Sequence, residues 1–280
     1  MTHRRHLLFL AAAALCLAAT PALADDAVLM TAVNSPHRTA ANTARDQARH
    51  PYESLLFWGL KPRQTVIEVS PGGGYWTEIL APYAKATGGT YVATAADLAN
   101  PKLSDAARKA RAAFEAQYAD TARYGAIRYA GFGPVSGPLG PANSADMVIT
   151  ARNIHNWAPN PAFLDKAMKD FHAVLKPGGV LAVEEHRADP KPEAPNYATG
   201  YMSEASVIAA AEKAGFKLAA RSEINANPKD TKDHPFGVWT LPPSRWTTAN
   251  GQGSDPKFDR AKYDAVGESD RMTLRFVKPS

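Results

Sequence analysis

A glycine-rich turn between an expected strand and an expected helix is the first segment whose residue types favour ligand binding. Glu68 lies in a run of strand formers that begins at Thr65, and Ser70, Gly72 and Gly74 follow at alternate positions. Glycine lets backbone N–H groups approach a ligand closely, because it has no Cβ and adopts positive φ readily. An ordinary tight turn of an α/β sheet has the same composition, so the turn alone leaves both interpretations open.

Polar and aromatic residues also follow three other expected strands, at 89–94, 147–150 and 180–183. Because ligands bind at the carboxyl ends of parallel strands, we expect these residues and the glycine turn to converge on one crevice. The residues in question are Thr94, Asp97, Asn153, His155, Trp157, Glu184, Glu185 and His186.

His155 is the candidate catalytic residue, because an imidazole titrates near neutral pH and a positioned base accelerates proton transfer. The alternative is a histidine packed beside Trp157 and hydrogen-bonded to backbone. We assign Trp157, Glu184 and His186 to substrate contact. Only one of Glu184 and Glu185 is expected to face the crevice, since adjacent strand residues point to opposite faces. His155, His186 and a carboxylate lack the spacing of known metal motifs, so no metal is expected.

The order of these segments resembles that of class I S-adenosylmethionine-dependent methyltransferases over roughly residues 50–278. The pattern Glu68-x-Ser70-x-Gly72-x-Gly74 resembles their glycine motif, with Ser in place of the first Gly. An Asp-hydrophobic strand from Asp146, a Leu-Lys-Pro-Gly-Gly turn and a closing strand at 271–278 follow in the order of that fold. Within the superfamily the chain is similar to an exported bacterial group of predicted methyltransferases, on segments 152–157, 227–230 and 269–271.

The resemblance implies an α/β fold: a Rossmann-like seven-stranded sheet, mostly parallel with an antiparallel last strand, flanked by helices and preceded by a helical lead-in. It also implies S-adenosylmethionine (S-adenosyl-L-methionine) as cofactor. The turn would pass under the methionine and adenosine parts, Glu68 would orient the amino end, and Asn153 would hold that end or the acceptor. The residues that the resemblance assigns to the cofactor are Glu68, Ser70, Gly72, Gly73, Gly74, Thr94, Asp97 and Asn153.

Two positions depart from the methyltransferase pattern. Thr94 stands where an acid normally holds the ribose hydroxyls, and the nearest acid is Asp97. Gly131 and its neighbours replace the acid expected near the adenine after the third strand. Two hypotheses follow. The first is an exported methyltransferase acting on a small-molecule acceptor. The second is a catalytically degenerate binding module of the same fold for an adenosine-like or other small organic ligand.

The first 24 residues predict export to the periplasm or secretion. Arg4 and Arg5 precede a short apolar run, and Ala22-Leu-Ala24 is a typical cleavage pattern. The run is too short to span a membrane, so no stable anchor is expected after cleavage. A twin-arginine route and a plain basic n-region both fit the first residues. Cleavage would remove Cys16, the chain's single cysteine, and lower the net charge from +5 to +3 by the loss of two arginines.

After these 24 residues, the chain of 280 residues divides into a helical lead-in at 25–58 and a methyltransferase-like domain at 59–280. No clustered basic face indicates nucleic-acid binding. Further expected elements are helices at 51–58, 75–83, 100–118 and 203–215, a weak strand at 127–129, a Gly/Pro-rich loop at 131–141 and a strand at 216–224. Residues 225–267 lack periodicity and are expected to cover one end of the sheet as a loop-rich excursion.

Overall fold

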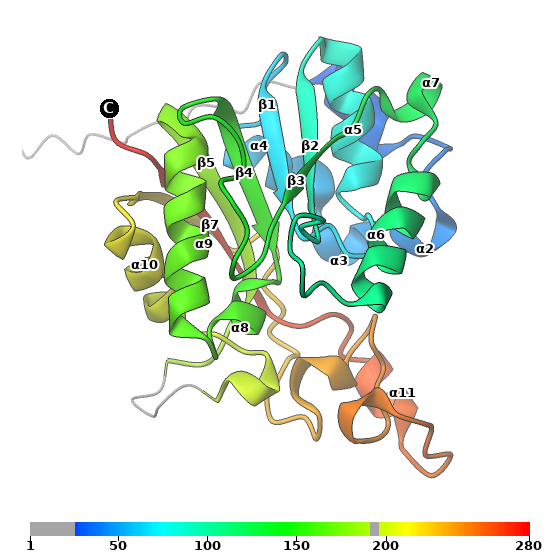
Figure 1. The fold of residues 1–280 in the computed structure, drawn as a ribbon. Coiled ribbons are helices and arrows are strands. Elements are labelled where there is room, and N and C mark those ends of the chain that lie inside the picture. Colours follow the sequence, from blue (N-terminus) through cyan, green and yellow to red (C-terminus); the bar gives the residue numbers. More distant parts are fainter. Residues whose placement is uncertain (1–25, 191–195) are drawn as a thin grey trace, which may run out of the picture.

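The computed structural model describes residues 26–190 and 196–280, so the export segment expected at 1–24 lies outside the described residues. A seven-stranded sheet of order β3-β2-β1-β4-β5-β7-β6 forms the centre, with helices on both faces (Figure 1). The strands are β1 Thr65–Val69, β2 Thr90–Ala95, β3 Arg128–Gly131, β4 Ala145–Ala151, β5 Leu175–His186, β6 Lys217–Ser222 and β7 Arg271–Val277.

Strands β1 to β5 pair in parallel, and β7 runs antiparallel between β5 and β6. The predicted fold class, including the antiparallel last strand, is therefore confirmed. The helices are α1 Ala27–Val33, α2 Ala40–Thr43, α3 Asp46–Arg49, α4 Pro51–Trp58, α5 Thr77–Thr87, α6 Asp105–Gln117, α7 Thr121–Tyr124, α8 Ile154–Trp157, α9 Pro161–Val174, α10 Glu204–Lys213 and α11 Arg260–Asp264. Among the described residues, no helix is both long enough and apolar enough to cross a membrane.

The two faces of the sheet are buried by different helices. Helices α9 and α10 cover one face, where Ile67 and Phe171 belong to one apolar cluster. Helices α1, α4 and α5 cover the other face, where Val66 and Ile79 belong to a second cluster. Val66 and Ile67 point to opposite sides because strand side chains alternate. The sheet is thus buried on both faces, as parallel sheets require.

The helical lead-in is confirmed as four short helices that pack beside the sheet. Pro51 at the first position of α4 and left-handed Gly59 after its end give this helix the expected start and stop signals. Trp58 is fully buried, and its indole N–H donates to the carbonyl of Leu274 in β7 (3.2 Å). The lead-in is therefore fixed to β7, and α3 lies near the carboxyl ends of the strands (Figure 1).

The segment at 176–179 differs from the predicted organisation, and the segment at 225–267 agrees with it. The expected turn at Lys176-Pro-Gly-Gly179 is instead a bulge within β5, because Leu175 pairs with Ala145 and Val180 with Met147. Gly178 supplies the positive φ of 77° in this bulge. The excursion at 225–267 contains the 3-10 turns η2 Gly237–Thr240 and η3 Ala249–Gly251 and covers the strand ends beside α8, as predicted (Figure 1).

Candidate functional site

The glycine turn combines an open cradle with a packed corner. Gly72 has φ 58°, and no atom lies within 4 Å of a Cβ built on Gly72 or on Gly73. A Cβ on Gly74 would lie 1.8 Å from the hydroxyl oxygen of Tyr118, at φ 76°. Gly72 and Gly73 therefore leave room for a ligand, whereas Gly74 is required by packing and by its backbone conformation. Ser70 also has a positive φ, 50°.

Glu68 does not face this cradle, which corrects the expectation that it orients a ligand's amino end. Its side chain lies on the α5 face of the sheet, where Oε2 accepts hydrogen bonds from the hydroxyls of Thr77 (2.9 Å) and Tyr91. Burial raises its pKa to about 7, although both hydrogen bonds act in the opposite direction. Glu68 therefore holds the start of α5 against β1 and β2.

Thr94 and Asp97, the two residues expected near a ribose, lie at the carboxyl end of β2, beside β3. The Oγ1 of Thr94 accepts the N–H of Ser70 (2.8 Å), so Thr94 fixes the start of the glycine turn. Asp97 is half-buried at the carboxyl end of β2, and its Cγ lies 2.9 Å from a Cβ built on Gly131. Its carboxylate thus lies beside β3, within the edge at which a ligand on the turn would bind.

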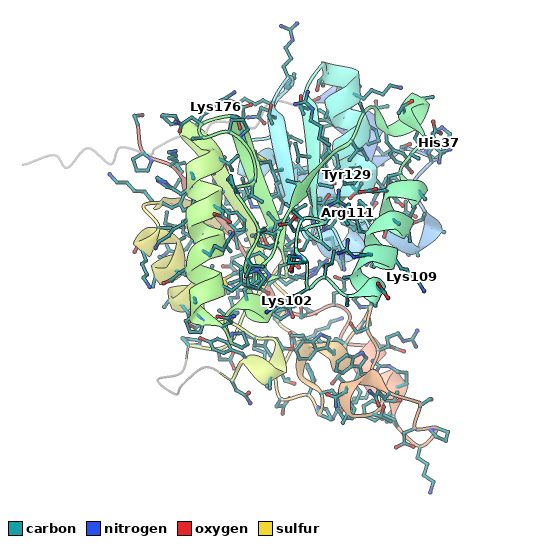
Figure 2. All side chains as sticks on the ribbon, viewed as in Figure 1. His37, Lys102, Lys109, Arg111, Tyr129 and Lys176 are labelled. Atoms are coloured by element: carbon teal, nitrogen blue, oxygen red, sulfur yellow. The ribbon has the colours of Figure 1, made fainter. Side chains whose placement is uncertain are left out.

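Helix α6 contacts the carboxyl end of β2 and the neighbouring strand β3 through Arg111. Arg111 donates to the carbonyl of Ala96 (2.8 Å), and its guanidinium lies 5.9 Å from the centre of the Tyr129 ring (Figure 2). The Nδ2 of Asn153 donates to the carbonyl of Val69 (3.0 Å) and joins the end of β4 to the end of β1. The carboxyl ends of β1, β2 and β4 are thus linked by hydrogen bonds at this end of the sheet.

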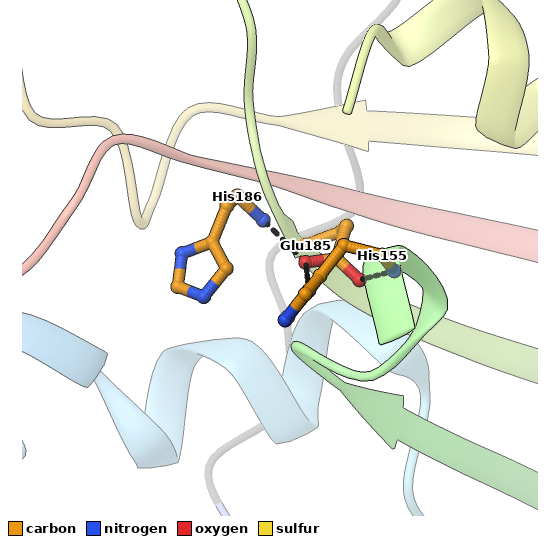
Figure 3. A group of neighbouring side chains, drawn as sticks. All are labelled: His155, Glu185 and His186. Carbon is orange, nitrogen blue, oxygen red and sulfur yellow. Dashed lines mark hydrogen bonds and ion pairs between the residues drawn. The ribbon is translucent and has the colours of Figure 1, made fainter. Parts of the chain in front are cut away.

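His155 and Glu185 form a buried hydrogen-bonded pair. Glu185 is fully buried, and its Oε1 lies 2.9 Å from Nδ1 of His155 while Oε2 accepts the backbone N–H of His155 (3.2 Å). A carboxylate only accepts, so Nδ1 donates and Nε2 keeps its lone pair. Figure 3 shows Nε2 of His155 on the side of the ring away from Glu185. Glu185, to which no role was assigned from the sequence, is thus the residue that sets the tautomer of His155.

His186 lies next to this pair, with its ring centre 5.1 Å from that of His155. Its Nδ1 lies 2.6 Å from Oγ of Ser269. Burial, His155 and nearby arginines such as Arg152 hold the pKa of His186 well below its usual range, so this imidazole is neutral near pH 7. His155, Glu185 and His186 also offer ligand atoms within 4.8 Å of one another, which is close enough for the three to hold a metal ion together.

Trp157 is not available for substrate contact, which corrects that assignment. It is 5% exposed and packs edge-on against Phe132 (ring centres 5.3 Å) within the apolar cluster under α9. Helix α8 has a single turn, so His155 and Trp157 point in different directions from it. His155 faces a cavity and Trp157 faces the core.

The cavity beside His155 has a volume of about 220 Å³ and lies between α3, the end of β4, the end of β5 and the η2 region. Three arginines, Arg45, Arg49 and Arg152, line it together with His155 and His186. Apolar side chains of the excursion form another part of its wall. Those side chains are Val238, Trp239, Pro242 and Pro243.

A chain of buried ion pairs supports this cavity. Arg49 pairs with Glu268 (2.8 Å), which also binds Arg271 (2.7 Å). Arg271 binds Glu184 (2.9 Å), which in turn binds Arg152 (3.2 Å). Glu184 is fully buried, so its expected contact with substrate is replaced by a contact with two arginines that hold the site.

The electrostatics of the cavity favour negative charge. Burial lowers the pKa of Arg49 to about 9, with a further contribution from Arg152, while Glu268 opposes the change. Burial also disfavours the charge of Arg152, but Glu184 and Glu268 outweigh it and raise its pKa. Burial works against the ionised form of Glu268 as well, yet Arg271 and Arg49 hold its pKa below the usual value.

A family model described as a methyltransferase domain matches residues 40–221 of the chain. The protein is a member of this family. The match, with the sheet order, places it in the class I S-adenosylmethionine-dependent methyltransferase superfamily, as the resemblance predicted. A search of curated proteins finds no match.

Comparison with solved structures finds chains that are similar to this protein. The cyclase SpnF is 15% identical, with a TM-score of 0.51, and the match covers 83% of this chain and 81% of SpnF. A SAM-dependent methyltransferase from Aquifex aeolicus is 21% identical, with a TM-score of 0.47 and coverage of 65% and 87%. A Burkholderia thailandensis 1,6-didemethyltoxoflavin-N1-methyltransferase is 14% identical, with a TM-score of 0.45 and coverage of 86% and 79%. A cyclase shares this fold, so the reaction must be argued from the site.

The cofactor of the superfamily is S-adenosylmethionine, and the turn of this methyltransferase fits it. Gly72 and Gly73 leave a cradle that a Cβ would fill, and Asp97 supplies a carboxylate at the end of β2. Asp97, three residues after Thr94, lies at the same end of the sheet, beside Gly131. These residues would hold the adenosine and methionine parts of the cofactor.

Several residues of the methyltransferase site were missed by sequence reasoning. Arg152 and Ser269 lie in segments that carried the family resemblance, so those segments were a usable signal. Arg45 and Arg49 belong to a lead-in without a motif, and only the fold brings Arg49 to Glu268, 219 residues away.

Proposed function

We propose that this protein transfers a methyl group from S-adenosylmethionine to a small molecule that binds in the cavity beside His155. The observation that carries the proposal is the His155–Glu185 pair, in which a fully buried carboxylate orients an imidazole at the cavity wall. This arrangement is suited to a general base, because the acceptor atom must lose a proton when it is methylated.

The roles of the residues follow from the geometry. S-adenosylmethionine, when bound, supplies an activated methyl group on sulfur. Nε2 of His155 accepts the proton of an acceptor N–H or O–H, and Glu185 stabilises the resulting imidazolium through Nδ1–H. A base positioned in this way contributes ~10²–10⁴-fold. His186 stays neutral beside it and adds no competing charge.

The glycine turn and the cavity are structurally connected, which supports a shared reaction centre. Tyr75 continues the turn, and the guanidinium of Arg49 lies 4.5 Å from the centre of its ring. Asn153 contacts the end of β1 through Val69, and His155 follows it by two residues at the cavity wall. The cavity volume is below the ~300–1,000 Å³ typical of drug-sized ligands, which favours a small acceptor.

The test is a turnover assay. Purified protein is incubated with S-adenosylmethionine and a panel of small acids, amines and phenols, and S-adenosylhomocysteine is measured by mass spectrometry. We expect at least one acceptor to give S-adenosylhomocysteine above the rate without acceptor. Cofactor binding with no turnover on any acceptor class would contradict the proposal.

The second candidate is a binding module that retains the fold without transfer. The observation in its favour is Thr94, whose Oγ1 is engaged by Ser70 where an acid normally holds the ribose. Such a module would bind S-adenosylhomocysteine weakly or not at all and would show no methylated product. Calorimetry with the cofactor, read together with the turnover assay, separates the two candidates.

We also propose that the protein is exported, on the basis of Arg4, Arg5 and the Ala22-Leu-Ala24 pattern. Mass spectrometry of the N-terminus in the native host should find Asp25 as the first residue. An intact Met1 in a cytoplasmic fraction would contradict this proposal.

A further inference from the structure

We infer that the acceptor is a small carboxylic acid whose carboxylate is held by Arg45, Arg49 and Arg152 while its apolar body lies against the η2 wall. That this ligand is the methyl acceptor rests on the proposed function. That the cavity binds an anion rests on the geometry alone. The three guanidinium groups come from α3, its preceding residue and the end of β4, and they meet at one small cavity.

Arg49 has donor capacity that the protein does not use. Its Nε is bound to Glu268, at 3.0 and 2.8 Å from the two carboxylate oxygens. Its Nη1 is buried and makes no hydrogen bond to any of the residues that the structure describes. A buried charged donor without a partner is costly, so an acceptor atom in the cavity would stabilise it. Arg49 is only 1% exposed.

Arg45, unlike Arg49, has no acidic partner among the described residues. Its Nε donates to the carbonyl of Ala41 (3.0 Å) and its Nη2 to the side chain of Asn42. Within 26–190 and 196–280 no carboxylate lies within ion-pair distance of it. Burial lowers the pKa of Arg45, and Arg152 adds to this, although Glu268 opposes it. An arriving anion would relieve this repulsion.

The charges around the cavity do not cancel. Four arginines and three carboxylates line the cavity or belong to the ion pairs and hydrogen bonds behind its lining, which leaves one positive charge before either histidine is protonated. The arginines are Arg45, Arg49, Arg152 and Arg271, and the carboxylates are Glu184, Glu185 and Glu268. Planar guanidinium groups bind carboxylates with paired hydrogen bonds, which supports a carboxylate as the ligand group.

The apolar part of the wall defines the rest of the ligand. Trp239 lines the cavity and stacks on Trp246 with ring centres 5.3 Å apart, so its indole is held rigidly. Val238, Pro242 and Pro243 extend this apolar surface. A flat or short apolar body, with a carboxylate at one end and the accepting atom near His155, satisfies both parts of the wall.

The experiment is calorimetric titration of the purified protein with benzoate and with benzamide, its neutral counterpart of the same shape, at constant ionic strength. We expect benzoate to bind at least about ten-fold more tightly, the value of one lost charge-assisted hydrogen bond. Equal affinity for the two probes would overturn the inference.

Variants locate the site. Arg45→Gln should weaken benzoate binding by about ten-fold and leave benzamide unchanged, and Arg45→Lys should recover part of the loss. Arg221→Gln, in an exposed ion pair on β6, is the matched control and should bind as the parent does. Thermal melting of each variant confirms folding. An Arg45→Gln variant that is folded and binds benzoate normally would contradict the assignment.

A third arm separates the acceptor from the cofactor, which has a carboxylate of its own. Benzoate titration is repeated with saturating S-adenosylhomocysteine. Retained affinity supports an acceptor site, and competitive loss overturns it. Benzoate binding with no turnover on any acceptor class supports the anion site and contradicts the proposed function. Methylation of neutral acceptors, together with equal affinities for benzoate and benzamide, supports the proposed function and contradicts the anion site.

Discussion

Replacing Glu184 or Glu185 by glutamine compares two adjacent, fully buried carboxylates that point to opposite faces of β5. Glu184 lies between Arg152 (3.2 Å) and Arg271 (2.9 Å), so Glu184→Gln leaves two buried guanidinium groups short of one charge. Breaking a buried ion pair costs ~3–5 kcal/mol. Because Glu268 still binds Arg271, we expect the low end, about 3 kcal/mol.

Glu185 has no arginine in direct contact among the described residues, and it accepts three N–H groups from His155 and His186. Glutamine keeps one accepting oxygen and turns an NH₂ group toward a donor, so Glu185→Gln should cost ~1–3 kcal/mol. It should also lower turnover by about 10²-fold, since the tautomer of His155 is no longer fixed.

The assays are thermal unfolding and turnover at a temperature where both variants are folded. At ~2–4 °C per kcal/mol for a chain of this size, Glu184→Gln should lower the Tm by about 6–12 °C. Glu185→Gln should lower the Tm less and lower turnover more. Equal effects of the two variants on both measurements would refute the assigned division between support and catalysis.

Three further predictions concern Glu68, the glycine turn and His155. Burial raises the pKa of Glu68 from 4.5 to about 7, so its ionisation should lower the free energy of unfolding by about 3 kcal/mol as pH rises through that window. Glu68→Gln should therefore be more stable than the parent at pH 8 and equally stable at pH 4. Equal stability of the two proteins to urea at pH 8 would contradict this. Gly73→Ala should keep the Tm but weaken cofactor binding by about ten-fold or more, because its Cβ enters the open cradle. Gly137→Ala, also in open space, should change neither. A Gly73→Ala variant with unchanged calorimetric affinity for the cofactor would exclude the cradle. His155→Ala should lower turnover by ~10²–10⁴-fold with cofactor affinity within a few-fold, whereas parallel losses of both would make His155 a cofactor contact.

The strands of the sheet and the glycine turn were predictable because their signals are local, whereas the turn expected at 176–179 is a bulge within β5. Ser203 caps α10 through its Oγ, and the glycine turn follows β1 where the pattern placed it. The direction of Glu68 was also predictable, since strand alternation puts Val66 and Glu68 on one face. The error there came from reading the motif instead of the strand period.

The other misassigned or missed residues depend on tertiary contacts that no local pattern contains. Trp157 lies one short turn after the strand, and only the position of Phe132 and α9 decides that it enters the core. Arg49 is held at the cavity by its ion pair with Glu268 and its contact with the Tyr75 ring, and both partners are remote from it in sequence. Charged residues on short helices have no periodic signature, so their convergence requires the fold.

Calorimetric titration of the purified protein with S-adenosylmethionine and S-adenosylhomocysteine tests the central claim most directly. Gly72 and Gly73 leave the cradle open, and Asp97 lies at the adjoining sheet edge. We predict one site that binds both compounds, with the affinity reduced in Gly73→Ala and retained in Gly137→Ala. No binding of either compound at ~1 mM, which is weaker than about −4 kcal/mol, would contradict the account.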